Sequence, residues 1–138
     1  MLFRSDVRMV PEEDPAQFLE TVRKVINDPA VSVRYAPRPD RPIAAAAQLD
    51  SDAFRTIETF VAKVYDTVTL PIMGTCATDM AQVRSAGPQC YGIGPASDFE
   101  DGAKGYGSHS DQERILESEL HRFVRFAWDV VVGMARTK

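Results

Sequence analysis

The segment GSHSDQE, residues 107–113, places a histidine in a polar, glycine-flanked loop directly before a long apolar helix. Neutral imidazole is the commonest metal ligand among side chains, and small neighbours leave the ring of His109 accessible. A catalytic zinc ion takes about three protein ligands and a water. The chain has 2 histidines, and the other one, His121, lies within the predicted final helix. The segment therefore indicates one part of a metal site rather than a complete one.

The composition is that of a globular chain with a mild acidic charge. The 138 residues are 44% hydrophobic and carry a formal net charge of −4. The sequence has no clustered basic face, so we expect no nucleic-acid partner. Its apolar runs are much shorter than the ~20 residues that a membrane span needs, so we expect no membrane partner. Cys76 and Cys90 match no zinc motif, and we interpret them as free thiols, which weakly favours the cytoplasm.

Residues 1–42 predict a strand, a helix and a second strand. Apolar and charged residues alternate over residues 6–11, which is typical of a short strand with one exposed face. Asp14 followed by Pro15 predicts a helix start with an N-cap and a first-turn proline. Alternation returns over residues 31–35 and predicts the second strand. This order is typical of half of an α+β layer.

A proline-rich segment follows. Residues 36–42 contain three prolines and three charged residues, a composition that resists regular structure and is typical of a linker. We therefore predict two units, residues 1–42 and residues 43–138.

Helix and strand alternate in the second predicted unit. Its elements, in order, are a helix after Asp50 or Ser51, a helix over residues 79–86 capped by Thr78, a strand over residues 90–95, a polar loop over residues 96–108 and a final helix opened by Asp111 or Ser118. The predicted buried side of the final helix consists of Leu120, Phe123, Val124, Ala127, Trp128, Val131 and Met134. The alternation predicts an α/β unit.

Five short motifs, in this order along the chain, resemble a known family. They are DVRMVP at residues 6–11, RP at 41–42, ATDM at 77–80, YGIGP at 91–95 and GSHSDQER at 107–114. The chain resembles the C-terminal part of the dinuclear zinc exopeptidases, the metallopeptidases of the aminoacylase, glutamate carboxypeptidase, Gly-X carboxypeptidase and succinyl-diaminopimelate desuccinylase type. The resemblance implies an α/β fold: part of a zinc-exopeptidase catalytic domain, preceded by half of an α+β, ferredoxin-like lid domain that often dimerises through its sheet edge.

The resemblance also implies roles for single residues. His109 matches the metal ligand that the family carries near its C-terminus, with Asp111 and Glu113 as supporting or helix-capping neighbours. The residues that match the family's substrate-binding surface are Arg41, Gly74, Thr78, Asp79, Gly92 and Gly94. The same residues have simpler interpretations, since Thr78 can cap a helix, Asp79 can favour a helix start, and Arg41 can be a solvated linker charge. We expect His121 to border the core.

The complete family enzyme binds two zinc ions and hydrolyses a terminal peptide bond or the N-acyl amide of a small peptide or N-acyl amino acid. Its first zinc histidine, bridging aspartate, remaining carboxylate ligand and general-base glutamate have no counterpart in this sequence. The chain supplies at most one ligand, His109, so we expect it to be an incomplete piece of the enzyme and inactive alone. The alternative is a non-catalytic module for dimerisation or interaction with a partner.

Overall fold

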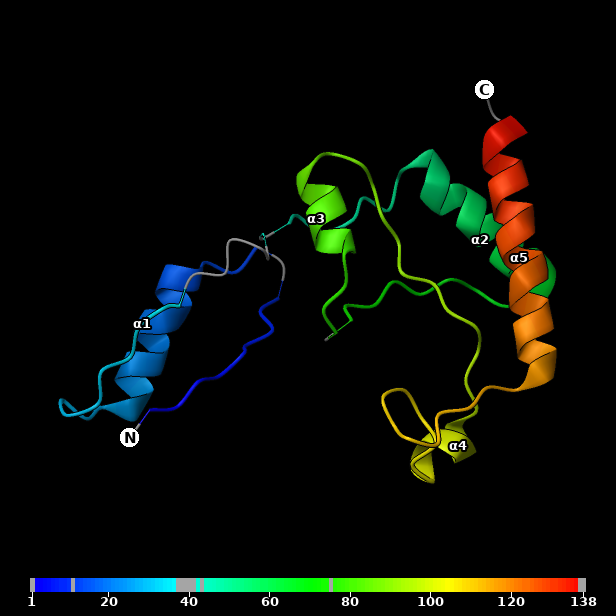
Figure 1. The fold of residues 1–138 in the computed structure, drawn as a ribbon. Coiled ribbons are helices and arrows are strands. Elements are labelled where there is room, and N and C mark those ends of the chain that lie inside the picture. Colours follow the sequence, from blue (N-terminus) through cyan, green and yellow to red (C-terminus); the bar gives the residue numbers. More distant parts are fainter. Residues whose placement is uncertain (1, 11, 37–41, 43, 75, 137–138) are drawn as a thin grey trace. The chain divides into compact units, whose positions relative to one another are not determined.

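The computed structural model describes residues 2–10, 12–36, 42, 44–74 and 76–136. Within these ranges all regular structure is helical (Figure 1). The helices are α1 (Pro15–Ile26), α2 (Asp52–Tyr65), α3 (Met80–Ser85), α4 (Phe99–Ala103) and α5 (Glu117–Arg136). In this part of the chain no helix is both long and apolar enough to cross a bilayer.

The prediction of an α/β fold with a ferredoxin-like lid is wrong, because the described residues form no strand. Residues 6–10, 31–35 and 90–95, which the sequence predicts as strands, have no regular structure. A strand is stable only when a neighbouring strand accepts and donates its backbone hydrogen bonds and covers its apolar face. In these segments that cover is missing: Val7 is 51% exposed and Val31 is 47% exposed. Apolar and polar residues do alternate in these segments, but among the described residues no neighbouring strand pairs with them.

Helix α1 begins where the sequence predicts, and both of its ends are capped. Asp14 is the N-cap, and its Oδ1 accepts a hydrogen bond of 2.7 Å from the backbone N–H of Ala16. Pro15 occupies the first helical position, where its missing N–H costs nothing. Asn27 ends the helix in the left-handed conformation, with φ 45°, and its N–H donates to the carbonyl of Arg23. The local signals therefore suffice for this helix, although none of its residues is buried.

The chain divides into two compact units. One contains Met1–Ala47 and Ile72–Cys90, with α1 and α3, and the other contains Gln48–Pro71 and Tyr91–Lys138, with α2, α4 and α5. The predicted division at residue 42 falls beside residues outside the described ranges and stays a prediction.

The core of the second unit lies between α2 and α5, which cross and pack against each other (Figure 1). Its buried side chains are Phe54, Ile57 and Phe126, which are 8%, 7% and 2% exposed. The ring of Phe126 meets that of Tyr65 edge-on, with centroids 5.7 Å apart. The helices approach closely at Gly133, where an added Cβ would lie only 2.6 Å from the Phe60 ring.

The start of α2 is fixed by a predicted cap. The Oγ of Ser51 accepts the N–H of Phe54 at 3.1 Å and lies 2.5 Å from the hydroxyl of Tyr91. That hydroxyl donates to the carbonyl of Gln48, and the Tyr91 ring lies 5.6 Å from that of Phe54. The segment that follows residue 90 is thus held against the first turn of α2.

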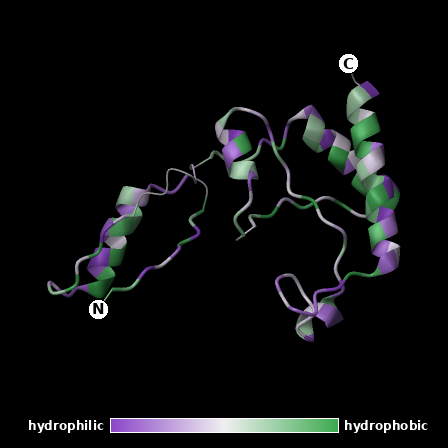
Figure 2. Cartoon of the chain, in the orientation of Figure 1, coloured by the Kyte–Doolittle hydropathy of each residue, from purple (hydrophilic) through white to green (hydrophobic). Residues whose placement is uncertain are grey.

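The predicted buried side of α5 is largely wrong. Leu120, Val124, Trp128 and Val131 are 44%, 60%, 69% and 64% exposed, whereas Phe126, which lies outside that predicted set, is the most buried of the core side chains. Helix α5 is apolar on more than one side (Figure 2), and only one side meets α2. The periodicity of a helix does not show which of two apolar sides finds a partner.

The chain exposes more surface than its size requires. Two independently folded globular units that share its mass of 15.3 kDa would expose roughly 8,500 Å² in all. The accessible surface here is 11332 Å². The exposed large apolar side chains of the second unit include Leu120, Val124, Trp128 and Val131 on the outer side of α5.

Candidate functional site

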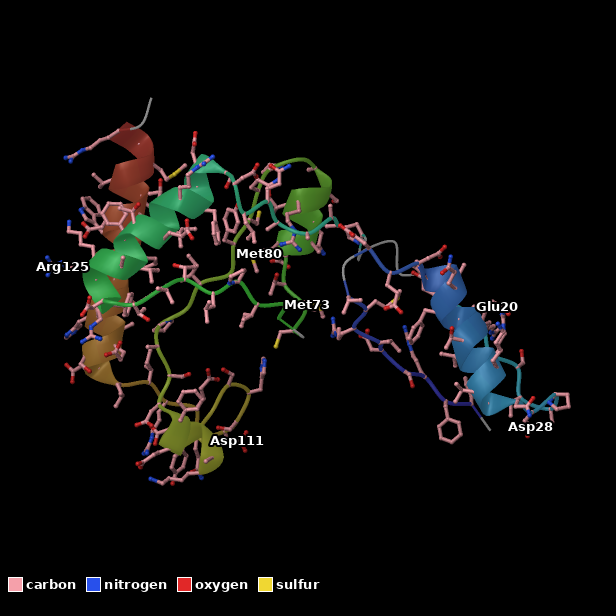
Figure 3. The ribbon with its side chains drawn as sticks, turned by 180° about the vertical axis from the view of Figure 1, so that it is seen from behind. Glu20, Asp28, Met73, Met80, Asp111 and Arg125 are labelled. Atoms are coloured by element: carbon pink, nitrogen blue, oxygen red, sulfur yellow. The ribbon has the colours of Figure 1, made fainter. Side chains whose placement is uncertain are left out.

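His109 lies on a loop that closes on α4. We call residues 105–114 the His109 loop; in Figure 3 the label of Asp111 marks it beside α4. Helix α4 is a single short turn capped by Asp98, whose Oδ1 accepts the N–H of Glu100 at 2.7 Å. The sequence predicts only a polar loop here, because a five-residue helix has too few positions for a periodic pattern.

The base of the His109 loop is closed by Arg114. Its guanidinium donates two hydrogen bonds to the carboxylate of Asp101, from Nε at 2.9 Å and from Nη2 at 2.5 Å. The same guanidinium lies over the ring of Tyr106, 4.1 Å from the centroid, which is a cation–π contact. The backbone N–H of Arg114 donates to the carbonyl of Tyr106 at 3.3 Å. One side chain therefore joins both ends of the loop to α4.

The electrostatics of this clamp follow from the paired hydrogen bonds. The hydrogen bond from Arg114 lowers the pKa of Asp101 below its ordinary value. The bond to Asp101 in turn raises the pKa of Arg114. Both groups are charged at neutral pH, so the forked pair is fully formed there. The sequence did not indicate the roles of Asp101, Tyr106 and Arg114, because the paired side chains are 13 positions apart and correspond to no local motif.

The tip of the loop presents the imidazole of His109. The residue has φ 71°, in the left-handed region, and its side chain is exposed. Its backbone N–H donates to Oε2 of Glu113 at 3.1 Å, and the N–H of Ser110 donates to the carbonyl of Gly107 at 3.3 Å. These bonds hold the backbone of the tip and leave both ring nitrogens without a protein partner among the described residues. The imidazole is thus available to a ligand.

His109 could supply one ligand to a metal ion, but its described surroundings do not supply the further ligands of a complete site. The part of the chain that the structure describes contains no group of three His, Cys, Asp or Glu side chains able to hold a metal ion. The carboxylate of Glu113 accepts the backbone N–H of His109 within the loop and caps no helix. A catalytic zinc needs about three protein ligands, so these residues alone do not form its site.

The substrate-binding residues implied by the resemblance divide between the two units. Gly74, Thr78 and Asp79 belong to the unit of α3, whereas Gly92 and Gly94 belong to the unit of His109. Arg41 lies outside the described residues. The joint role of these residues therefore stays a prediction.

The described residues of this set lie beside α3 or in an irregular segment. Thr78 uses its Oγ1 to accept the N–H of Met80, the first residue of α3, at 3.2 Å, although the N-cap position itself belongs to Asp79. Asp79 occupies the N-cap position of α3 without a side-chain cap bond, and Gly87, with φ 111°, follows the end of the helix. Gly92 and Gly94 are exposed in an irregular segment.

The prediction for the two cysteines is confirmed, whereas the prediction for the second histidine is wrong. Cys76 and Cys90 are free thiols. His121 was expected to border the core, but it is exposed on α5. It lines a pocket with basic neighbours instead.

No protein-family model, curated protein or solved structure matches the chain. The resemblance to the zinc exopeptidases rests on the five motifs alone.

Proposed function

We propose that this chain contributes one metal ligand, His109, and part of a substrate-binding surface to a zinc-dependent hydrolase. The substrate is a terminal peptide bond, or the N-acyl amide of a small peptide or N-acyl amino acid. The other ligands and the general base come from residues outside this chain, so the chain alone is inactive. The observation that carries the proposal is the exposed imidazole of His109 at the tip of a closed loop, within the longest of the five motifs.

The construction of the His109 loop supports a role as a preformed ligand position. Asp101, Tyr106 and Arg114 fix its two ends, and Glu113 fixes the backbone at the tip. A loop held in this way loses little further conformational entropy when the imidazole binds a metal. An ordinary exposed histidine has no need of such support, so the geometry favours a ligand over a solvated side chain.

Zinc in such a site lowers the pKa of a bound water and polarises the scissile carbonyl. The part of this chain is to hold a neutral imidazole at a fixed place. Because the described residues bring no three possible ligands together, we expect zinc binding by the isolated chain to be weak.

The experiment is a zinc titration by calorimetry on the wild type, on His109→Ala and on the matched control His121→Ala. We expect weak binding that His109→Ala removes and His121→Ala leaves unchanged, and no hydrolysis of N-acetylated amino acids by any of the three. Binding that depends on His121 instead would contradict the assignment of the ligand. Tight binding that depends on His109, in a chain that melts cooperatively, would mean that the metal site is self-contained.

The second candidate function is a non-catalytic interaction module, and the exposed apolar side of α5 favours it. That side carries Leu120, Val124, Trp128 and Val131, spaced to share one face of the helix. The dimer expected from the family uses a sheet edge, which the described residues do not contain. Sedimentation of the wild type and of Val124→Lys tests this candidate. A dimer that dissociates in the variant supports it, and a wild-type monomer over the accessible concentrations removes it.

A further inference from the structure

A pocket between α2 and α5 gathers basic side chains. It has a volume of about 370 Å³ and is lined by Lys63, Val64, His121, Arg122 and Arg125. The first two come from the C-terminal end of α2 and the others from the first half of α5, so the packing of the two helices creates the cluster. All five belong to the unit that also contains the His109 loop. The cluster is not visible in the sequence, because Lys63 is far from Arg122 and Arg125 along the chain.

The positive charge of this basic pocket is only partly compensated. Arg122 forms an ion pair of 3.2 Å with Glu119, and its guanidinium lies 5.7 Å from the centroid of Tyr65. Lys63 lies 5.5 Å from the centroid of the Phe60 ring. Within the described residues neither Lys63 nor Arg125 forms an ion pair, and Arg125 extends away from α5 (Figure 3).

The balance of charge at the pocket is opposite to that of the chain. Lys63, Arg122 and Arg125 contribute three positive charges against one negative charge from Glu119, a formal excess of two. The whole chain has a formal net charge of −4. Like charges that share one pocket repel each other, and an anion of two or more charges removes that repulsion.

We propose that the basic pocket binds the phosphate group of a small molecule. Arginine forks match pairs of phosphate oxygens, and the lysine ammonium adds a point charge with three donors. The imidazole of His121 offers a further N–H, and Val64 gives the pocket an apolar wall against which the rest of the ligand can lie. The proposal is independent of the metal-ligand role of His109.

Two of the lining residues also have a structural role that needs no ligand. Lys63 lies in the last turn of α2, where a cation is stabilised by the helix dipole, and Arg122 pairs with Glu119. These roles predict no selective affinity for phosphate. The test therefore has to measure binding rather than stability.

The experiment is a titration of the full chain with inorganic pyrophosphate at constant ionic strength, followed by amide chemical shifts. The variants are Lys63→Gln and Arg125→Gln, and the matched control is Arg136→Gln, which removes the same charge from the last turn of α5. Helix content by circular dichroism confirms that each variant is folded. We expect each pocket variant to weaken binding by about tenfold, the loss typical of one charge-assisted hydrogen bond, and the control to stay within about twofold.

A second arm separates a soluble phosphate from a lipid headgroup. The chain is mixed with phosphatidylcholine vesicles that contain phosphatidic acid and is sedimented. Pyrophosphate binding without sedimentation assigns the pocket to a soluble phosphate compound, and sedimentation that Arg125→Gln abolishes assigns the same chemistry to a headgroup. No binding at millimolar pyrophosphate in the absence of sedimentation, or equal losses in Arg125→Gln and Arg136→Gln, would overturn the proposal.

Discussion

Removing the ring of Phe126 tests whether the contact between α2 and α5 is the core of its unit. Phe126 is 2% exposed, the least of the three buried side chains. Burial of three such side chains contributes about 5–9 kcal/mol before conformational entropy is counted, and a buried Phe→Ala change costs about 3–5 kcal/mol. A single substitution therefore removes about half of the gross apolar stabilisation of this core.

The loss of apolar stabilisation in Phe126→Ala is large, because little besides this core stabilises α2 and α5. Helix α2 has 14 residues, a length at which isolated helices are marginal in water, and α5 has 20. We expect Phe126→Ala to abolish the cooperative thermal transition and to reduce the ellipticity at 222 nm, mainly through loss of α2. Circular dichroism in the far and near ultraviolet measures both effects.

The matched control is Trp128→Ala on the same helix. Trp128 is 69% exposed, so its removal should change the stability by less than about 0.5 kcal/mol. A wild-type melting curve for Phe126→Ala would refute the reasoning. So would a larger loss for Trp128→Ala, because it would mean that the outer side of α5 is the buried one in solution.

Three further predictions concern the clamp, the helix contact and the cap. The pKa of Asp101 is lowered in the folded chain, so its pair with Arg114 stabilises the fold above the ordinary pKa of about 4, and this stabilisation is lost as the pH falls through the lower native value. The NMR shifts of the Tyr106 ring should therefore stay constant from pH 8 to about 5 and change only in stronger acid. In Asp101→Asn these shifts should be altered already at neutral pH. Gly133→Ala gains about 1 kcal/mol of helix propensity but pushes a Cβ into the ring of Phe60, at a typical cost of about 1–3 kcal/mol. Thermal melting should show a net loss of stability, and adding F60L, whose side chain has no ring, should reverse it. A single variant more stable than the wild type would contradict the close approach of the two helices. Ser51→Ala removes the N-cap of α2 and should lower the free energy of unfolding in urea by about 1–2 kcal/mol; an unchanged midpoint would mean that the cap bond contributes nothing.

The starts of α1, α2 and α3 could be predicted because their causes are local. Asp14 and Ser51 each accept a backbone N–H within the first turn that follows them, and Thr78 does so before α3. A cap and the residues it serves are neighbours in the sequence, so the pattern contains all the information that the structure uses.

The strand predictions were wrong because the stability of a strand does not depend on local sequence alone. Residues 31–35 alternate correctly, but a strand depends on hydrogen bonds to another segment, and none is provided by the described residues. The same limit explains α5. Its apolar residues lie on more than one side, and the choice between Phe126 and Trp128 as the buried residue depends on where α2 lies.

The candidate site contains one feature with a local cause, which could be predicted, and others with non-local causes, which could not. His109 was identified from its own segment, because its glycine and polar neighbours are adjacent in sequence. The clamp of Asp101, Tyr106 and Arg114 was missed, since it joins residues through the folding of the loop. The basic pocket was missed for the same reason: Lys63 and Arg125 meet only when α2 packs on α5.

The most direct test of the central claim, that His109 is a preformed single metal ligand, is a zinc titration of the chain labelled with nitrogen-15 in its histidine side chains. The account predicts that the ring nitrogens of His109 shift progressively in the millimolar range, that those of His121 do not, and that Arg114→Ala weakens the response by releasing the loop. Equal shifts of both histidines, or a response that is unchanged in Arg114→Ala, would contradict it.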